Sequence, residues 1–110
     1  MLKTEKNIRQ KPYIEQYKKH LFNLCKQNDV KTLYAFGSVL TDKFNEKSDI
    51  DLIVSIDSNN PLDYADKYFN LKFAMQDLFK RPVDLLEEKA VRNQYLRCEI
   101  DNKKQIIYAK

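Results

Sequence analysis

The stretch that decides the fold is Tyr34-Ala35-Phe36-Gly37-Ser38, followed after ten intervening residues by Asp49-Ile50-Asp51-Leu52-Ile53-Val54. The first run is short, apolar and closed by the only glycine of the chain, which is typical of a buried strand that ends in a turn. In the second run, a strand would place Asp49 and Asp51 on one face and Ile50 on the other. Two strands, with a glycine turn and paired carboxylates at one end, are therefore the centre of the predicted fold.

Amphipathic helices and further short strands surround this centre. Apolar residues at helical spacing predict one helix of about four turns that begins near Pro12 and ends near Asn28. Further along the chain, the same reasoning predicts a helix over 61–80 capped by Asn60, a strand over 83–86, a turn over 87–90, a helix over 91–100 and a strand over 105–108. The order predicts a small α/β (α+β) domain, in which a mixed sheet of about four strands packs against helices.

The length of 110 residues suits one domain. We expect a flexible, polar segment over residues 1–11 and a single domain over residues 12–110. The first residues lack the apolar core of a signal peptide, and no apolar run approaches the roughly 18 residues that span a bilayer. The expectation is a cytoplasmic protein without membrane contact.

The charge distribution gives little support for binding to nucleic acid. Twenty basic and 16 acidic residues give a net charge of +4, and they are scattered without a block of like charges. A solvated surface accounts for this pattern, although composition leaves open a basic patch for nucleic acid or triphosphate. Because no recognition motif accompanies the charge, we expect no direct binding to nucleic acid.

The two cysteines, Cys25 and Cys98, lie far apart in the sequence and form no paired metal or redox motif. Both fall in amphipathic segments, which favours two reduced and partly buried thiols. A disulfide between them is the alternative.

The aspartates are the candidates for chemistry. Asp49 and Asp51 on one strand face would repel each other unless a cation lies between them, and Mg²⁺ prefers such hard oxygen ligands. Asp84 stands in the apolar run Val83-Asp84-Leu85-Leu86, where burial would carry a desolvation cost unless the carboxylate is paired or bound to metal. If the two strands are neighbours, Asp84 completes a three-carboxylate cluster that could hold two metal ions for phosphoryl displacement.

Gly37 and Ser38 are candidates for holding phosphates, because free backbone N–H groups and a hydroxyl at a glycine turn bind anions. Each part also has a plainer interpretation. Gly37-Ser38 can be only a turn, Asp49 and Asp51 can be a solvated strand edge, and Asp84 can accept hydrogen bonds from a loop. The conjunction of all three parts favours catalysis.

These motifs resemble the nucleotidyltransferase superfamily that includes DNA polymerase beta and kanamycin nucleotidyltransferase. The runs Phe36-Gly37-Ser38, Ser48-Asp49-Ile50-Asp51-Leu52 and Pro82-Val83-Asp84-Leu85-Leu86 are most similar to the minimal nucleotidyltransferase branch. The resemblance covers nearly the whole chain. One departure is that the loop after Ser38 lacks the arginine and the second glycine that the family often carries. Lys43 or Lys47 could replace the basic phosphate contact, but a solvated loop lysine is the favoured interpretation.

The resemblance implies a nucleotidyltransferase fold and a Mg²⁺-dependent transfer from ATP. It implies that Asp49, Asp51 and Asp84 are catalytic and bind two Mg²⁺ ions, with Asp84 as a metal ligand or general base. Gly37, Ser38 and Ser48 would then contact the nucleotide.

The resemblance also implies a protein partner. Minimal nucleotidyltransferases typically act as antitoxins of HEPN-domain ribonuclease toxins, and several transfer AMP to a tyrosine of that toxin. We therefore expect a hetero-oligomer with a HEPN toxin. Two alternatives stay open: a non-catalytic antitoxin that acts by binding alone, and an enzyme that modifies a small molecule. The absence of residues for an acceptor-binding domain disfavours the second.

Overall fold

The protein is described by a computed structural model over residues 12–110, so the expected flexible segment over 1–11 lies outside the described residues. Four strands form one mixed sheet: β1 (Val30–Phe36), β2 (Ile50–Ile56), β3 (Val83–Glu87) and β4 (Gln105–Ala109). Their order is β3-β2-β1-β4, with β1 antiparallel to both neighbours and β2 parallel to β3. The predicted mixed α/β fold is confirmed.

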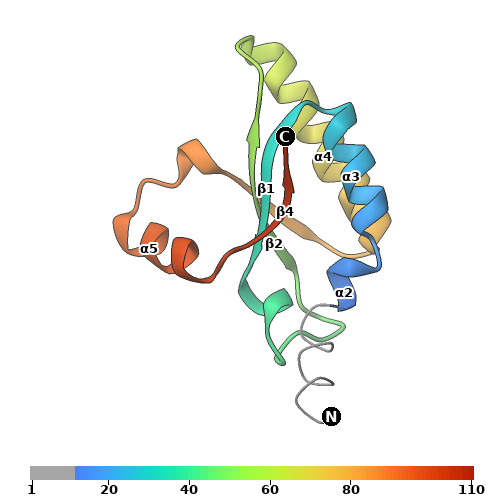
Figure 1. Cartoon of the computed structure of the whole chain (residues 1–110), viewed down its shortest axis with the longest axis vertical. Coiled ribbons are helices and arrows are strands. Elements are labelled where there is room, and N and C mark those ends of the chain that lie inside the picture. The colour runs from blue at the N-terminus through green and yellow to red at the C-terminus, as the bar shows by residue number, and fades with distance from the viewer. Residues whose placement is uncertain (1–11) are drawn as a thin grey trace.

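Helices lie on both sides of the sheet, unevenly. The helical segments are α2 (Pro12–Glu15), α3 (Lys18–Gln27), η1 (Gly37–Leu40), α4 (Pro61–Phe79), η2 (Glu88–Ala90) and α5 (Gln94–Lys103), where η marks a 3₁₀ helix. Figure 1 shows α3 and α4 side by side along one face of the sheet, whereas α5 lies on the opposite side. Among these described helices, none is long and apolar enough to cross a membrane.

The main core fills the space between the sheet and α3 and α4. Strand β2 contributes every second residue to it, namely Ile50, Leu52, Val54 and Ile56, as the alternation in the sequence predicted. Ile53 is also buried, but it faces the other side, where it lies near Ile100 of α5. Asp51 therefore shares a face with Ile53, away from the main core.

The boundaries of α4 follow from local chemistry. The side chain of Asn60 accepts hydrogen bonds from the N–H groups of Leu62 and Asp63, and Pro61 occupies the first helical position. At the other end, Lys80 adopts a left-handed conformation with φ 57°, and its N–H donates to the carbonyl of Gln76. Both ends lie where the sequence predicted them.

The prediction of one continuous helix from Pro12 to about Asn28 was wrong. The helix is interrupted after Glu15, where the N–H of Tyr17 donates to the carbonyl of Ile14. This turn lets two tyrosine rings pack on one residue: the ring centres of Tyr13 and Tyr17 lie 5.9 and 5.0 Å from that of Phe79. Aromatic packing in the tertiary structure decides the break, and a helical spacing pattern cannot reveal it.

Other boundaries also differ from the prediction: α5 ends at Lys103 rather than Ile100, and β3 and β4 each extend one residue further. Helix α5 begins at Gln94 rather than Val91, because the side chain of Asn93 caps it by accepting from the N–H groups of Tyr95 and Leu96. Strand β2 begins at Ile50, so Asp49 lies directly before the strand.

The two cysteines differ in environment. Both are free, so the alternative of a disulfide is wrong, and Cys98 is exposed rather than partly buried. Cys25 lies in the main core, where burial raises the pKa of its thiol to about 12.

Candidate functional site

The turn at Gly37 forms one side of the site. Phe36 is extended, and Gly37 then takes φ +79°, in the region where residues with a Cβ atom are strained. The following 3₁₀ helix is closed by Thr41, whose N–H and hydroxyl both donate to the carbonyl of Ser38, at 2.9 and 3.0 Å. The turn requires glycine for a second reason: a Cβ atom on Gly37 would lie 2.6 Å from Oδ2 of Asp51.

Two aspartates are paired at this end of the sheet. Asp51 of β2 and Asp84 of β3 are direct partners in the parallel register, so both side chains leave the same face. Burial raises the pKa of the half-buried Asp51 carboxyl, and the negative charges of Asp84 and Asp49 raise it further. Asp84 and Asp49, which the sequence also singled out, are therefore close enough to Asp51 to act on its carboxyl.

Asp49 and Asp84 differ from Asp51 in their exposure to solvent. Both are exposed, so the expectation that Asp84 is a desolvated carboxylate inside an apolar strand was wrong. The neighbours Val83 and Leu85 are buried on the other face, and α5 covers the Asp84 face only farther along the sheet. Alternation gives the face of a side chain but not what covers that face.

The carboxylate oxygens of the three aspartates are chemically suited to bind a hard divalent cation. Carboxylate oxygens are the ligands of Mg²⁺, and a cation would relieve the repulsion that raises the pKa of Asp51. Within residues 12–110, no three His, Cys, Asp or Glu side chains come together as a group that could hold a metal ion. The aspartates are thus neighbours rather than a closed ligand set, and Mg²⁺ usually takes its remaining ligands from substrate phosphates and water.

The candidate serines and lysines have different surroundings. Ser48 lies in the loop before Asp49, and its hydroxyl oxygen accepts a hydrogen bond from the N–H of Asn45 at 3.0 Å. Ser48 therefore has a structural contact in the loop. Lys43 and Lys47, the candidate phosphate contacts, are both exposed in this loop.

The structure adds a residue that the sequence did not assign to the site. The guanidinium of Arg81 donates to the carbonyls of Asn45 and Ser48, both at 2.9 Å, so it lies against the loop that leads to Asp49. Its position in the sequence next to Pro82-Val83-Asp84 was the only available signal. No spacing rule connects an arginine with carbonyl groups more than thirty residues away.

A groove of about 530 Å³ lies on the sheet between the β1–β2 pair and η2 and α5. Tyr34 and Ser55, which line it, belong to the strands that carry the glycine turn and Asp51. Two lysines also line it, Lys31 and Lys89, together with Arg97, whose guanidinium is paired with Glu88 at 3.2 Å. The groove is of the size of ligand sites in proteins and is bordered by positive charge.

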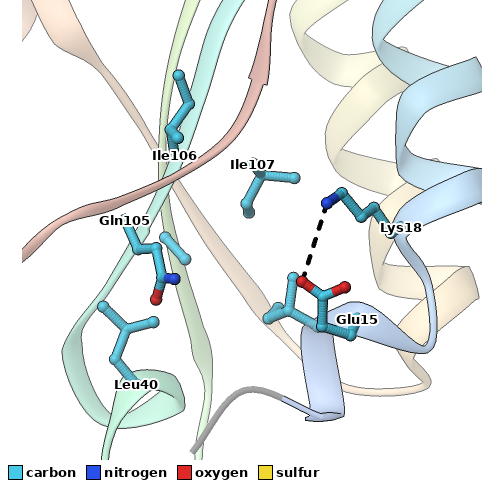
Figure 2. A pocket seen from close by; sticks show the side chains of 8 residues that line it. Glu15, Lys18, Leu40, Gln105, Ile106 and Ile107 are labelled. Carbon is cyan, nitrogen blue, oxygen red and sulfur yellow. Dashed lines mark ion pairs between the residues drawn. The ribbon is translucent and has the colours of Figure 1, made fainter.

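A second pocket lies between the N-terminal helices and β4. Figure 2 shows its lining, in which Leu40, Ile106 and Ile107 are apolar and Glu15 forms an ion pair with Lys18 at 3.9 Å. None of the three candidate aspartates lines this pocket. It is therefore separate from the candidate site.

A glycine turn thus lies beside paired carboxylates at one end of a mixed sheet, and paired carboxylates can hold the metal ions of a phosphoryl displacement. The family described as polymerase beta, nucleotidyltransferase matches residues 19–110. The chain belongs to this family and is a nucleotidyltransferase, as the resemblance in the sequence predicted.

The chain is similar to known proteins both in sequence and in three-dimensional structure. One is "Putative protein adenylyltransferase MJ0128" of Methanocaldococcus jannaschii, 36% identical over 84 residues, which cover 76% of this chain and 83% of the relative. A solved structure described as "putative minimal nucleotidyltransferase" superposes with a TM-score of 0.69 at 24% identity, over 84% of this chain and 90% of that one. Another, described as a tri-AMPylated Shewanella oneidensis HEPN toxin in complex with MNT antitoxin, gives a TM-score of 0.59 at 17% identity, over 87% and 72%. These two structures share the fold.

Proposed function

We propose that this chain is the antitoxin of a toxin-antitoxin pair and transfers AMP from ATP to a tyrosine of a HEPN-domain ribonuclease toxin. The observation that carries the proposal is the contact geometry of Gly37, Asp51 and Asp84, in which a glycine turn for phosphates adjoins register-paired carboxylates. The similarity to proteins named as protein adenylyltransferases, and to an antitoxin bound to an AMPylated HEPN toxin, supports the same substrate and partner.

The proposed reaction is a displacement at the α-phosphorus of ATP. The tyrosine oxygen of the toxin forms a bond to this phosphorus, and the bond to the bridging oxygen of the leaving pyrophosphate breaks. Asp84 is the candidate to accept the hydroxyl proton, because it is exposed to an incoming acceptor. The N–H groups at Gly37 and Ser38 and the Ser38 hydroxyl are the candidates to hold the phosphates.

Asp49, Asp51 and Asp84 are the residues that would hold Mg²⁺. When bound, two Mg²⁺ ions would neutralise the triphosphate and acidify the acceptor hydroxyl. The raised pKa of Asp51 agrees with this role: burial first, and then the charges of Asp84 and Asp49, disfavour the ionised carboxyl, and a cation beside it would offset both.

The toxin would supply the surface that grips its own tyrosine, in a hetero-oligomer with this chain. The groove bordered by Lys31 and Lys89 lies on the same sheet as the aspartates and is open to a partner. We propose that the pair works in the cytoplasm, without contact with a membrane or with nucleic acid.

The experiment uses the purified chain, MgCl₂, ATP labelled at its α-phosphate and the purified HEPN toxin. We expect label on the toxin, and none when Asp49 and Asp51 are both changed to alanine. Asp77→Ala is the matched control, because Asp77 is an exposed aspartate on α4 whose ion pair with Lys80 is open to solvent. This control should label the toxin at the wild-type rate.

Two outcomes would contradict the proposal in different ways. If the wild-type chain labels no toxin, AMP transfer to this partner is wrong. If the double alanine variant labels nothing but still suppresses the ribonuclease activity of the toxin, the alternative of an antitoxin that acts by binding alone is supported instead.

A further inference from the structure

Arg81 makes four contacts around one loop. Its Nη1 atom donates to the carbonyls of Asn45 and Ser48 at 2.9 Å each. The guanidinium carbon also lies 4.5 Å from the ring centre of Phe44 and 4.9 Å from that of Tyr13. The two rings also contact each other, with centres 4.9 Å apart, so the half-buried guanidinium lies beside an aromatic pair while it binds the loop backbone.

These contacts connect the three aspartates. The carbonyl of Ser48 is held by Arg81, and the N–H of Ile50 donates to the carbonyl of Pro82 at 3.1 Å. Asp49 lies between these two anchored residues, and Asp84 follows Pro82 by two positions in β3. The segment 81–82 therefore fixes the backbone on both sides of Asp49 relative to the strand that carries Asp84.

Besides Arg81, the loop is held by Phe44, whose ring packs against the core and against Tyr13. The internal hydrogen bonds of the loop are short in sequence range, such as the N–H of Ser48 to the carbonyl of Asn45 at 3.0 Å. The Asn45 carbonyl accepts from both Ser48 and Arg81, so the guanidinium joins the internal turn to the rest of the protein.

We propose that Arg81 is a positioning residue, which holds Asp49 beside Asp51 and Asp84 and thereby sets the affinity of this carboxylate group for a divalent cation. The inference rests on the proposed metal-dependent function. Lysine is not equivalent to Arg81, because a compact ammonium lacks the planar, delocalised surface with which the guanidinium contacts the rings of Tyr13 and Phe44. Residues that orient metal ligands from behind typically change metal affinity by about 10- to 100-fold.

The test compares Arg81→Lys with wild type in two measurements on the full chain. The first is hydrogen exchange of the backbone amides over residues 43–49 in the metal-free protein, which we expect to become faster. The second is the dissociation constant for Mn²⁺, followed by electron paramagnetic resonance, which we expect to rise about tenfold or more. Arg92→Lys is the matched control, since Arg92 is an exposed arginine outside the loop, and both values should stay at the wild-type level.

The outcomes separate this inference from the proposed function. If wild type binds no Mn²⁺, or if Asp51→Asn leaves its Mn²⁺ binding unchanged, the proposed metal site is wrong and the inference falls with it. Wild type that binds Mn²⁺, with an equal dissociation constant in Arg81→Lys, would overturn only the role of Arg81. If Arg81→Lys does not fold, Phe44→Leu replaces it, because this change removes one ring beside the guanidinium and should weaken Mn²⁺ binding to a smaller extent.

Discussion

Asp51 and Asp84 are direct partners in two parallel neighbouring strands, so two acidic side chains stand side by side on one face of the sheet. Like charges in cross-strand positions destabilise a sheet, so a protein in which these residues had no function would be more stable with the two charges apart. Asp51 is half-buried, which adds a desolvation cost to the repulsion. The ionised Asp51 carboxylate therefore lowers the stability of the metal-free protein.

Replacement of Asp51 by asparagine should stabilise the metal-free protein at neutral pH. Burial, Asp84 and Asp49 raise the pKa of Asp51 in the folded state above its unfolded value. Below the unfolded pKa, about 4, the carboxyl is protonated in both states and has no penalty; as the pH rises through the folded pKa, ionisation costs more in the folded state. The free energy of unfolding of Asp51→Asn should thus exceed that of wild type at pH 7, and the difference should shrink as the pH falls towards 4.

Urea denaturation in EDTA at both pH values measures this difference, with Asp77→Asn as the control on an exposed carboxyl. Added Mg²⁺ should raise the midpoint of wild type more than that of Asp51→Asn, because only the folded wild type offers the full carboxylate group. An Asp51→Asn variant that is less stable than wild type at pH 7 would show that the carboxylate has a structural partner instead.

Gly37→Ala should both destabilise the protein and abolish transfer. An alanine at φ +79° costs about 1–2 kcal/mol in backbone strain, and its Cβ atom would overlap with Oδ2 of Asp51 at 2.6 Å. The overlap pushes the carboxylate out of its place in the site, so activity should fall even in the fraction that remains folded. Urea denaturation and labelling of the toxin at a temperature well below unfolding measure the two effects.

A double-mutant cycle separates strain from overlap at Gly37. In an Asp51→Ala background the carboxylate oxygen is gone and only the strain remains, so the stability cost of Gly37→Ala should be smaller there than in wild type. Equal costs in both backgrounds would mean that the glycine is required by its backbone conformation alone.

The features set by local periodicity could be predicted from the sequence. Alternation placed Ile50 and Leu52 in the core and Asp51 on the opposite face, and the run that ends in Gly37 correctly predicted the turn. These inferences succeed because a strand has a period of two residues and because only glycine tolerates the left-handed conformation cheaply.

The features set by distant contacts could not be predicted. The break before Tyr17 depends on packing against Phe79, and the exposure of Asp84 depends on how far α5 covers the sheet. The contact of Arg81 with the carbonyl of Ser48 joins groups 33 positions apart and leaves no periodic trace. Such contacts form only in the tertiary structure, and no pattern in a single sequence indicates which residues make them.

Two apolar residues of α4 that lie two positions apart should differ strongly in how much their truncation destabilises the protein. Met75 is fully buried in the main core, so Met75→Ala should cost about 2–5 kcal/mol of unfolding free energy through lost burial and a cavity. Phe73 is 59% exposed and is stacked on Phe69 at the solvent side, so Phe73→Ala should cost less than about 1 kcal/mol. Urea denaturation of both variants tests the assignment of the buried face, and similar losses would contradict it.

Lys80→Gly should stabilise the protein, because Lys80 ends α4 in the left-handed conformation with φ 57°. Glycine removes the strain of the Cβ atom while the hydrogen bond from this N–H to the carbonyl of Gln76 stays in place. The exposed ion pair between Lys80 and Asp77, at 3.5 Å, is worth little, so the net gain should be about 0.5–1 kcal/mol. Lys72→Gly, within the same helix, is the matched control and should instead cost about 1 kcal/mol. Thermal and urea unfolding of both variants measure the contrast, and a Lys80→Gly protein that is no more stable than wild type would show that the left-handed lysine is not strained.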